Sequence, residues 1–282
     1  MNNLLLRTLT GIAFLIVMIG CIVLSPVTFI LLFAAVTGLV TWEFVTLVNN
    51  HTEASVNRVI CTAGAVYLFF AFAAYCGAWQ GVEVFVPYVL TLIYLPIAEL
   101  YLKNKRPIES WAYAFAAHLY VALPFALLSA LAFIGNDVNG LNTYNWQLPL
   151  SIFVFLWVND TGAYCVGSLL RNRFKAKLFE RISPKKSWVG SIGGGLFVLM
   201  AAALFYALTP LNMSLLQWLG LGLTVAVFGT WGDLVESHIK RTFGVKDSSN
   251  VLPGHGGFLD RFDSSLIAIP AAVLYLYTLM FL

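Results

Sequence analysis

Long apolar blocks separated by short polar breaks dominate this chain. A helix needs roughly 20 consecutive apolar residues to cross the hydrocarbon core of a bilayer. Nine blocks approach this length, and the breaks carry turn-forming residues such as Ser25-Pro26 and Thr209-Pro210. The pattern predicts an all-α, polytopic membrane protein of about nine transmembrane helices. The predicted helices cover residues 8–25, 27–48, 57–77, 83–101, 110–134, 148–170, 189–208, 215–235 and 264–282.

Composition agrees with a membrane protein. Of the 282 residues, 60% are hydrophobic and 10% are charged, and the mean hydropathy is +0.84. A soluble chain of this length could not bury so much apolar surface. The net charge of +3 gives no basis for a nucleic-acid partner. The four cysteines fall within apolar runs and lack metal-ligand spacing, so we expect them to be small buried residues rather than disulfide partners.

The basic residues fall on one side of the predicted topology. With the N-terminus in the cytoplasm, the cytoplasmic segments hold Arg7, Arg58, the bases of 103–106, seven bases in 171–186 and four in 240–261. These are all 16 lysines and arginines of the chain, and the opposite loops hold none. Short loops rich in Lys and Arg stay cytoplasmic. We therefore predict a cytoplasmic N-terminus and a C-terminus on the opposite side of the cell membrane.

Candidate chemistry is distributed unevenly between the two halves. Residues 1–134, which hold spans one to five, are expected to act mainly as scaffold. Within them, Glu43 and Glu99 are either functional acids or acids paired with a neighbouring polar group. Residues 135–282 hold spans six to nine, with predicted catalytic cytoplasmic loops at 171–188 and 236–263.

The stretch 233–263 concentrates the charges. It holds five of the chain's 13 acids and four of its 16 bases, together with Gly254, Gly256 and Gly257. Mg²⁺ prefers carboxylate oxygens and shares its coordination with substrate phosphates, while lysine and arginine neutralise the remaining phosphate charge. Glycines also let backbone N–H groups approach an anion. This composition suits a site for a metal and a polyanion, but a generic charged loop of this kind is more often a solvated connection between two membrane helices.

The order of residues from Ser237 to Asp263 is more specific than their composition. It reads Ser-x-x-Lys-Arg-x4-Lys-Asp, and later Leu-Pro-x-His-Gly-Gly-Phe-x-Asp-Arg-Phe-Asp. This order resembles the signature of the phosphatidate cytidylyltransferases, also called CDP-diacylglycerol synthases. The resemblance implies that CTP and phosphatidic acid react to CDP-diacylglycerol and pyrophosphate, with Mg²⁺ required.

A second block, from Ser183 to Gly190, supports the same resemblance. It reads Ser-Pro-Lys-Lys-Ser-Trp-Val-Gly, where the family usually has Ser-Pro-Lys-Lys-Thr-Trp-Glu-Gly. Ser187 keeps the hydroxyl of the family's threonine, whereas Val189 replaces a glutamate and puts any role of that acid in doubt. The two blocks suggest that the resemblance covers roughly residues 157–264.

Candidate site residues follow from the blocks and their places on the predicted spans. Asp233 ends span eight and Asp260 and Asp263 open span nine, so we expect these three to bind Mg²⁺, with room for a second cation. They are also catalytic candidates, together with Lys240, Arg241 and His255. Candidate substrate-binding residues are Asp160, Tyr164, Ser183, Lys185, Lys186, Ser187, Ser237, Lys246, Asp247, Gly256, Gly257 and Arg261.

Several of these residues have structural alternatives. His255 could stabilise a turn, and the helix face shared by Asp160, Tyr164 and Gly167 could be a packing face with one hydrogen-bonded acid. The glycines of 190–195 lack the Gly-Lys-Ser/Thr ending of a P-loop, so close helix packing is the favoured interpretation for them.

The implied partners are cytosolic CTP and phosphatidic acid in the membrane leaflet, and a homodimer is compatible with the sequence. Phosphatidate is already ionised near neutral pH, so positioning and charge neutralisation suffice and no general base is needed. A CTP-dependent kinase of polyprenols or other lipid alcohols is one alternative, which would release CDP. A secondary transporter is another, although charges gathered at one membrane face favour an enzyme.

Overall fold

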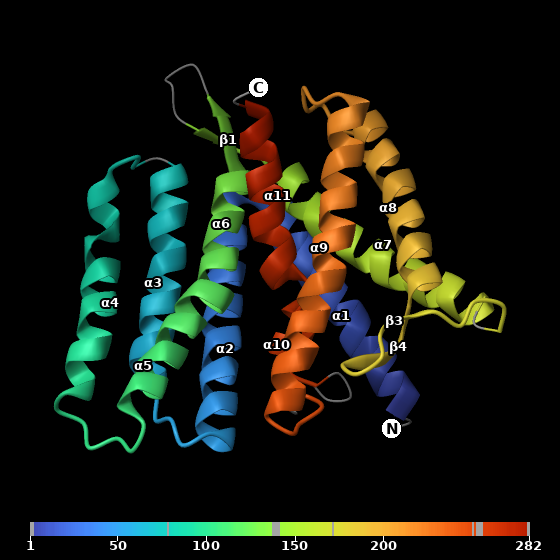
Figure 1. The fold of residues 1–282 in the computed structure, drawn as a ribbon. Helices are drawn as coiled ribbons and strands as arrows, with labels where there is room; N and C mark the ends of the chain where they lie inside the picture. The colour runs from blue at the N-terminus through green and yellow to red at the C-terminus, as the bar shows by residue number, and fades with distance from the viewer. Residues whose placement is uncertain are drawn as a thin grey trace. The chain divides into compact units, whose positions relative to one another are not determined.

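The computed structural model describes residues 3–77, 79–136, 142–170, 172–249, 251 and 256–280. The chain forms two compact units (Figure 1). The N-terminal unit comprises Met1–Trp146 and Phe243–Phe262, and the C-terminal unit comprises Gln147–Thr242 and Asp263–Leu282. The charged stretch 233–263 is therefore divided between the units, and each unit is described by itself.

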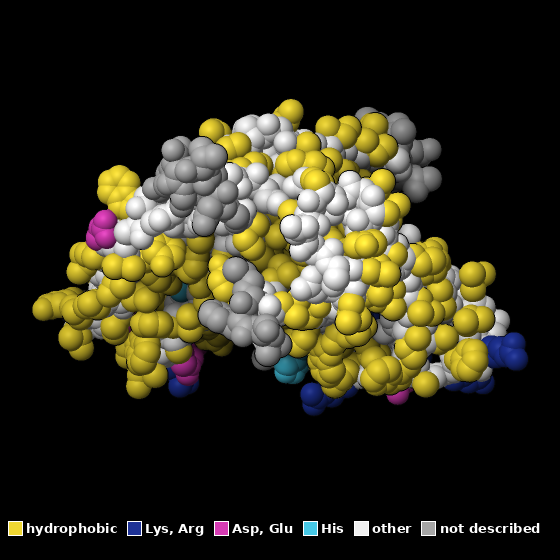
Figure 2. Space-filling model, turned by 90° about the horizontal axis from the view of Figure 1, so that it is seen from above, with side chains coloured by type: hydrophobic (Ala, Val, Ile, Leu, Met, Phe, Trp, Pro, Cys, Tyr) yellow, Lys and Arg dark blue, Asp and Glu magenta, His cyan; other side chains and the backbone are white. Residues whose placement is uncertain are grey.

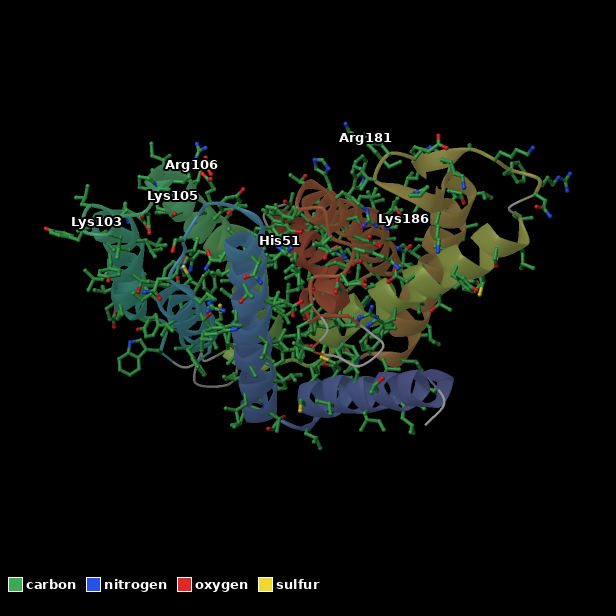
Figure 3. The ribbon with its side chains drawn as sticks, turned by 90° about the horizontal axis from the view of Figure 1, so that it is seen from below. His51, Lys103, Lys105, Arg106, Arg181 and Lys186 are labelled. Carbon is green, nitrogen blue, oxygen red and sulfur yellow. The ribbon has the colours of Figure 1, made fainter. Side chains whose placement is uncertain are left out.

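The N-terminal unit is built mainly from helices. They are α1 (Asn3–Leu24), α2 (Pro26–His51), α3 (Arg58–Cys76), the 3₁₀ turn η1 (Val82–Phe85), α4 (Val86–Glu99), α5 (Pro107–Ala116), the π-helical turn η2 (Ala117–Ala122), α6 (Leu123–Ala132) and α10 (Leu259–Phe262). A short antiparallel hairpin of β1 (Phe133–Asn136) and β2 (Asn142–Tyr144) follows α6. Ser25 and Thr28 form a capping box at the start of α2, and Figure 3 shows α1 leaving α2 there at a wide angle.

The C-terminal unit packs four long helices with one hairpin. Its elements are α7 (Gln147–Leu169), β3 (Lys177–Phe179), β4 (Ser183–Ser187), α8 (Trp188–Leu208), α9 (Leu215–Thr242) and α11 (Ser265–Met280). β3 and β4 pair antiparallel. Neither hairpin was predicted, because strands of three to five residues are too short to show the apolar alternation that marks a strand.

The prediction of an all-α polytopic membrane protein is confirmed. Among the described residues, eight helical segments are long and apolar enough to cross a membrane, from Pro26–His51 to Leu259–Leu279. The apolar part of α1, Thr8–Leu24, is shorter than these segments. The described chain thus has eight clear candidate spans and one shorter first helix, where the sequence predicted nine spans.

One predicted boundary is wrong by two turns. Span eight was expected to end at residue 235, but α9 continues to Thr242. Residues 236–242 are therefore helical and not part of a loop. Lys240 and Arg241 lie in the last turn of α9, where cations interact favourably with the helix dipole.

Aromatic side chains form the core of the N-terminal unit. The ring of Phe29, which is fully buried, lies 5.0 Å from that of Phe33, 6.4 Å from Phe69 and 5.7 Å from Tyr144. These contacts join α2, α3 and the β1–β2 hairpin. Aromatic ring pairs stabilise such a core beyond the burial of apolar area alone.

The segment Phe243–Phe262 is fastened to this unit by aromatic contacts at both ends. The ring of Phe243 stacks on that of His51 at the end of α2, with centroids 6.3 Å apart. At the other end, Phe262 packs edge-on against Phe125 of α6 at 5.5 Å and Phe14 of α1 at 5.9 Å. Both ends of this segment are therefore attached to the N-terminal helices.

Small residues set the α7–α8 contact in the C-terminal unit. A Cβ on Gly162 of α7 would lie 3.0 Å from the side chain of Phe197, and one on Gly194 of α8 would lie 2.6 Å from the carbonyl oxygen of Asn159. A Cβ on Gly193 would lie 2.5 Å from Val166. The packing interpretation of the 190–195 glycines is confirmed for these two, because small residues let helices approach closely.

Charged side chains of the N-terminal unit gather at the turn between α4 and α5. Figure 2, seen from above, shows mainly hydrophobic and uncharged side chains. Figure 3, seen from below, labels Lys103, Lys105 and Arg106 at the α4–α5 turn. Arg106 Nε lies 3.1 Å from Glu53 Oε2. The hydrogen bond and the charge of Arg106 hold the pKa of Glu53 below its ordinary value.

Candidate active site

Asp233 connects the two sequence blocks within the C-terminal unit. The Lys186 Nζ atom lies 2.7 Å from Asp233 Oδ2, and the Ser237 hydroxyl donates to Asp233 Oδ1 at 3.1 Å. The side chains of Lys186 and Asp233 are 25% and 27% exposed, so water still reaches the pair. Lys186 belongs to the Ser-Pro-Lys-Lys block and Ser237 begins the 237–263 block, so one carboxylate contacts both blocks.

A glycine places Asp233 beside Asp263. A Cβ on Gly232 would lie 2.8 Å from the carbonyl oxygen of Ser264 and 2.9 Å from that of Asp263. Only glycine therefore lets the α9 backbone approach the start of α11 so closely. Asp263 lies within electrostatic range of Asp233, Asp160 and Lys186, and its Oδ1 accepts a hydrogen bond from the Ser264 amide at 2.5 Å.

These carboxylates are suited chemically to a hard cation. Three acids face one lysine in this cluster, and carboxylate oxygens are the ligands that Mg²⁺ prefers. Within the described part of the chain, however, no three acid, histidine or cysteine side chains approach one point closely enough to hold an ion. Asp233 and Asp263 share the C-terminal unit, whereas Asp260, the third predicted ligand, belongs to the N-terminal unit.

The β3–β4 hairpin separates two lysines that are neighbours in sequence. Successive residues of a strand point to opposite faces, so Lys185 is exposed while Lys186 is half-buried against Asp233. Figure 3 shows Lys186 turned inward and Arg181 at the outer edge of the β3–β4 turn. The ring of Phe179 on β3 packs edge-on against Trp231 of α9 at 5.9 Å, which fixes the hairpin on the helix that carries Asp233.

Ser187 has a structural role that the sequence did not reveal. It is the N-cap of α8, and its Oγ accepts a hydrogen bond from the Gly190 amide at 3.2 Å. Serine and threonine are both good N-caps, which explains why either suits this position. Ser183 begins β4 on the same hairpin. A direct role of either serine in substrate binding stays a prediction.

The two lysines should respond differently to substitution. Lys186→Gln removes the counter-charge of Asp233 and should lower kcat/KM about 10²-fold, the typical loss for one well-placed electrostatic contact. Lys185→Gln is the matched control on the same strand and should change kcat/KM less than about 5-fold, because exposed charges interact weakly. Steady-state rates of both variants at fixed ionic strength would check this, and equal losses would contradict it.

Asp260 binds two other residues of the 237–263 block, Ser248 and Gly257, within the N-terminal unit. Its Oδ2 accepts hydrogen bonds from the amides of Ser248 at 3.0 Å and Gly257 at 2.8 Å, and lies 2.9 Å from Ser248 Oγ. Gly256 has a φ of +78°, and a Cβ there would lie 2.5 Å from Asp260 Oδ2. The glycine at 256 is therefore required both by backbone conformation and by the closeness of this carboxylate.

A residue that the sequence left undecided joins the same cluster. Glu43 of α2, which is 7% exposed, accepts a hydrogen bond from the Phe258 amide at 2.8 Å and another from the Ser248 hydroxyl. Its position inside an apolar helix had allowed a functional acid or a paired one. The structure pairs it with Ser248 and Phe258, which belong to the 237–263 block.

The other candidates are distributed between buried and exposed positions. Lys240 is 8% exposed, and its Nζ lies 2.8 Å from Oε2 of Glu236, one turn earlier on α9. Tyr164 is 78% exposed on α7, and Gly167 packs near Gly190 of α8. The exposed charged candidates are Arg241, Lys246, Asp247, Arg261 and Asp160. His255 lies outside the described residues.

Comparison with known sequences decides the family. Residues 5–279 match the profile of the Cytidylyltransferase family. The chain belongs to the cytidylyltransferase family. It is 33% identical over 265 residues to the phosphatidate cytidylyltransferase of Staphylococcus aureus strain COL, covering 94% of this chain and 95% of that protein. It is 38% identical over 178 residues to the phosphatidate cytidylyltransferase of Bacillus subtilis strain 168, covering 63% and 61%.

Membership of this family confirms the predicted enzyme class, a nucleotidyltransferase embedded in a membrane. The predicted extent of the resemblance, residues 157–264, was too short. The family match includes α1 to α6 as well, so the N-terminal unit is more than a generic set of apolar helices.

Proposed function

We propose that the protein transfers the cytidylyl group of CTP to phosphatidic acid, giving CDP-diacylglycerol and pyrophosphate. The observation that carries this proposal is the Lys186–Asp233 pair, which joins both sequence blocks beside Asp263 in a chain of this family. Its relatives in Staphylococcus aureus and Bacillus subtilis are named as phosphatidate cytidylyltransferases.

The chemistry of the reaction requires charge neutralisation more than proton transfer. Phosphatidate has a second pKa near 6 and is a competent nucleophile at neutral pH. Lys186 can neutralise phosphate oxygens from its half-buried position, and the exposed Lys246 and Arg261 can bind the outer phosphates of CTP.

We further propose that Mg²⁺ acts with these residues. Asp233 and Asp263 would hold it, and Asp260 is three residues from Asp263, so their Cα atoms are at most about 11 Å apart along the chain. When bound, the ion would withdraw charge from the phosphates as pyrophosphate leaves. Ser237 holds the Asp233 carboxylate in place through its 3.1 Å hydrogen bond.

An apolar cavity offers a place for an acyl chain of the lipid substrate. It is an open hollow of about 620 Å³ on α8, lined by α8 residues such as Gly193 and Met200 and by Val166 of α7. Because a helix rises 1.5 Å per residue, Gly193 is about 9 Å along α8 from Ser187. A phosphate near the β3–β4 hairpin and a chain in this cavity would suit one amphipathic molecule.

The acceptor test is direct. Purified protein in detergent, with CTP and Mg²⁺, should form CDP-diacylglycerol from phosphatidic acid in a yield equal to the pyrophosphate released. Diacylglycerol or a polyprenol offered in its place should give no product, because neither carries the attacking phosphate. Turnover of either alcohol at a comparable rate would refute the proposal and favour the lipid-alcohol kinase.

We also propose that the site faces the cytoplasm, with the N-terminus on the same side and the C-terminus opposite. The support is the placement of all 16 lysines and arginines in alternate loops. In a variant whose native cysteines are replaced by serine, single cysteines at 104, 176 and 249 should react with an impermeant maleimide only after permeabilisation. A cysteine at 212 should react in intact cells, and reversal at any one position would contradict this topology.

A further inference from the structure

Glu43 is a buried acid whose two oxygens accept hydrogen bonds from residues of the 237–263 block. It lies in α2, more than 200 residues before the residues that it contacts. An acid inside a candidate membrane span is costly unless it is paired. Here Oε2 accepts from the Phe258 amide at 2.8 Å and Oε1 accepts from the Ser248 hydroxyl. Both of its oxygens therefore bind the segment that contains the Gly-Gly pair.

Ser248 links Glu43 to Asp260, because its hydroxyl lies within hydrogen-bond distance of both carboxylates. The Ser248 Oγ atom bonds to Glu43 and also lies 2.9 Å from Asp260 Oδ2. A serine hydroxyl has one proton, so it can donate to one carboxylate at a time. The two acids are thus linked through a single hydroxyl, and a change at one alters the hydrogen bonding of the other.

The second glycine of the Gly-Gly pair leaves room for Glu43. A Cβ on Gly257 would overlap Glu43 Oε1 and Ser248 Oγ. The backbone of Gly257 meanwhile donates to Asp260 Oδ2 at 2.8 Å. The glycine therefore allows one loop residue to contact both acids at once, a requirement that any larger residue would break.

We propose that Glu43 is a positioning residue for the reaction: by accepting hydrogen bonds from the Phe258 amide and the Ser248 hydroxyl it fixes these two residues so that Asp260 is correctly presented. This inference rests on the proposed function, since it assumes that Asp260 serves that reaction. It gives the N-terminal unit, predicted as scaffold, a defined role in the reaction. Glu43 acts by geometry and contacts no substrate.

Two substitutions distinguish geometry from charge. Glu43→Ala removes both acceptors and should lower kcat about 10–100-fold, the usual cost of losing a supporting hydrogen-bond partner, with little change in the KM for CTP. Glu43→Gln should keep activity within about 5-fold of wild type. Its amide oxygen can accept from Phe258, and its NH₂ can donate to Ser248, which then donates to Asp260. Thr41→Val, a buried control on the same helix, should resemble wild type.

A double-mutant cycle tests the contact itself. Gly257→Ala should be severely inactivating in the wild-type background, because its methyl group meets Glu43 and the Ser248 hydroxyl that Glu43 holds in place. In the Glu43→Ala background the same change should cost at least about 10-fold less, since residues in contact give non-additive effects. Additive losses would show that Glu43 and Gly257 act independently and would overturn the proposal.

Amide hydrogen exchange provides a readout that does not depend on the reaction. Peptides covering residues 256–260 should exchange faster in Glu43→Ala than in wild type or Thr41→Val, because the Phe258 amide loses its acceptor. Unchanged exchange, or a Glu43→Gln enzyme as inactive as Glu43→Ala, would overturn the positioning role. Wild-type protein that formed no CDP-diacylglycerol would instead refute the proposed function, while the exchange result would still report on Glu43.

Discussion

Asp233→Asn and Asp263→Asn should each lower kcat by at least about 10²–10³-fold, the range found when one electrostatic contact to a transition state is removed. Asn keeps the size of the side chain and one oxygen but removes a negative charge. In Asp233→Asn, Lys186 also loses its partner at 2.7 Å. The cluster would then bind Mg²⁺ weakly and hold Lys186 less firmly against the phosphates.

The double variant should be little worse than either single one, because both carboxylates serve the same centre. Raising Mg²⁺ or substituting Mn²⁺ should partly restore the single variants but not the double. Glu180→Gln, an exposed acid on the β3–β4 turn, is the control and should behave like wild type. Additive losses in the double variant would mean that Asp233 and Asp263 act in separate steps.

Asp260→Asn should be comparably damaging, with a loss in kcat of about 10²–10³-fold. Asp260 accepts from the amides of Ser248 and Gly257 and contacts the Ser248 hydroxyl. With its oxygen at the Oδ2 position, the asparagine would direct its NH₂ at the Ser248 amide, which lies 3.2 Å from Oδ1, so two donors would oppose each other there. Steady-state kinetics on protein that elutes as wild type from a sizing column would measure this. If Asp260→Asn kept more than about a tenth of the wild-type kcat, Asp260 would not belong to the catalytic centre.

Much of the fold could be predicted because a membrane-spanning helix requires a long run of apolar residues, which is visible in the sequence. The apolar blocks gave the helices α2 to α9 and α11 to within a few residues at most ends. The end of α9 was missed because hydropathy stops at about residue 235 while the helix continues as a polar segment. The Glu236–Lys240 spacing of i, i+4, now seen as an ion pair at 2.8 Å, was the signal that could have extended it.

The sequence could propose members of the candidate site but not their arrangement, and their roles stay predictions. The charge density of 233–263 and the Ser-Pro-Lys-Lys block identified Asp233, Lys186 and Asp260. Sequence could not distinguish Lys185 from Lys186, because a polar strand has no apolar face to fix which lysine points inward. It also could not connect Glu43 with Ser248, since a contact across 205 residues leaves no local pattern.

The fate of the CTP phosphates tests the central claim most directly. Parallel reactions with phosphatidic acid and either [α-³²P]CTP or [γ-³²P]CTP should separate the two chemistries available to a CTP-dependent membrane enzyme. The account predicts α-label in the lipid product and γ-label only in pyrophosphate, because the lipid phosphate attacks the α-phosphorus. Transfer of γ-label to lipid, with CDP released, would contradict it.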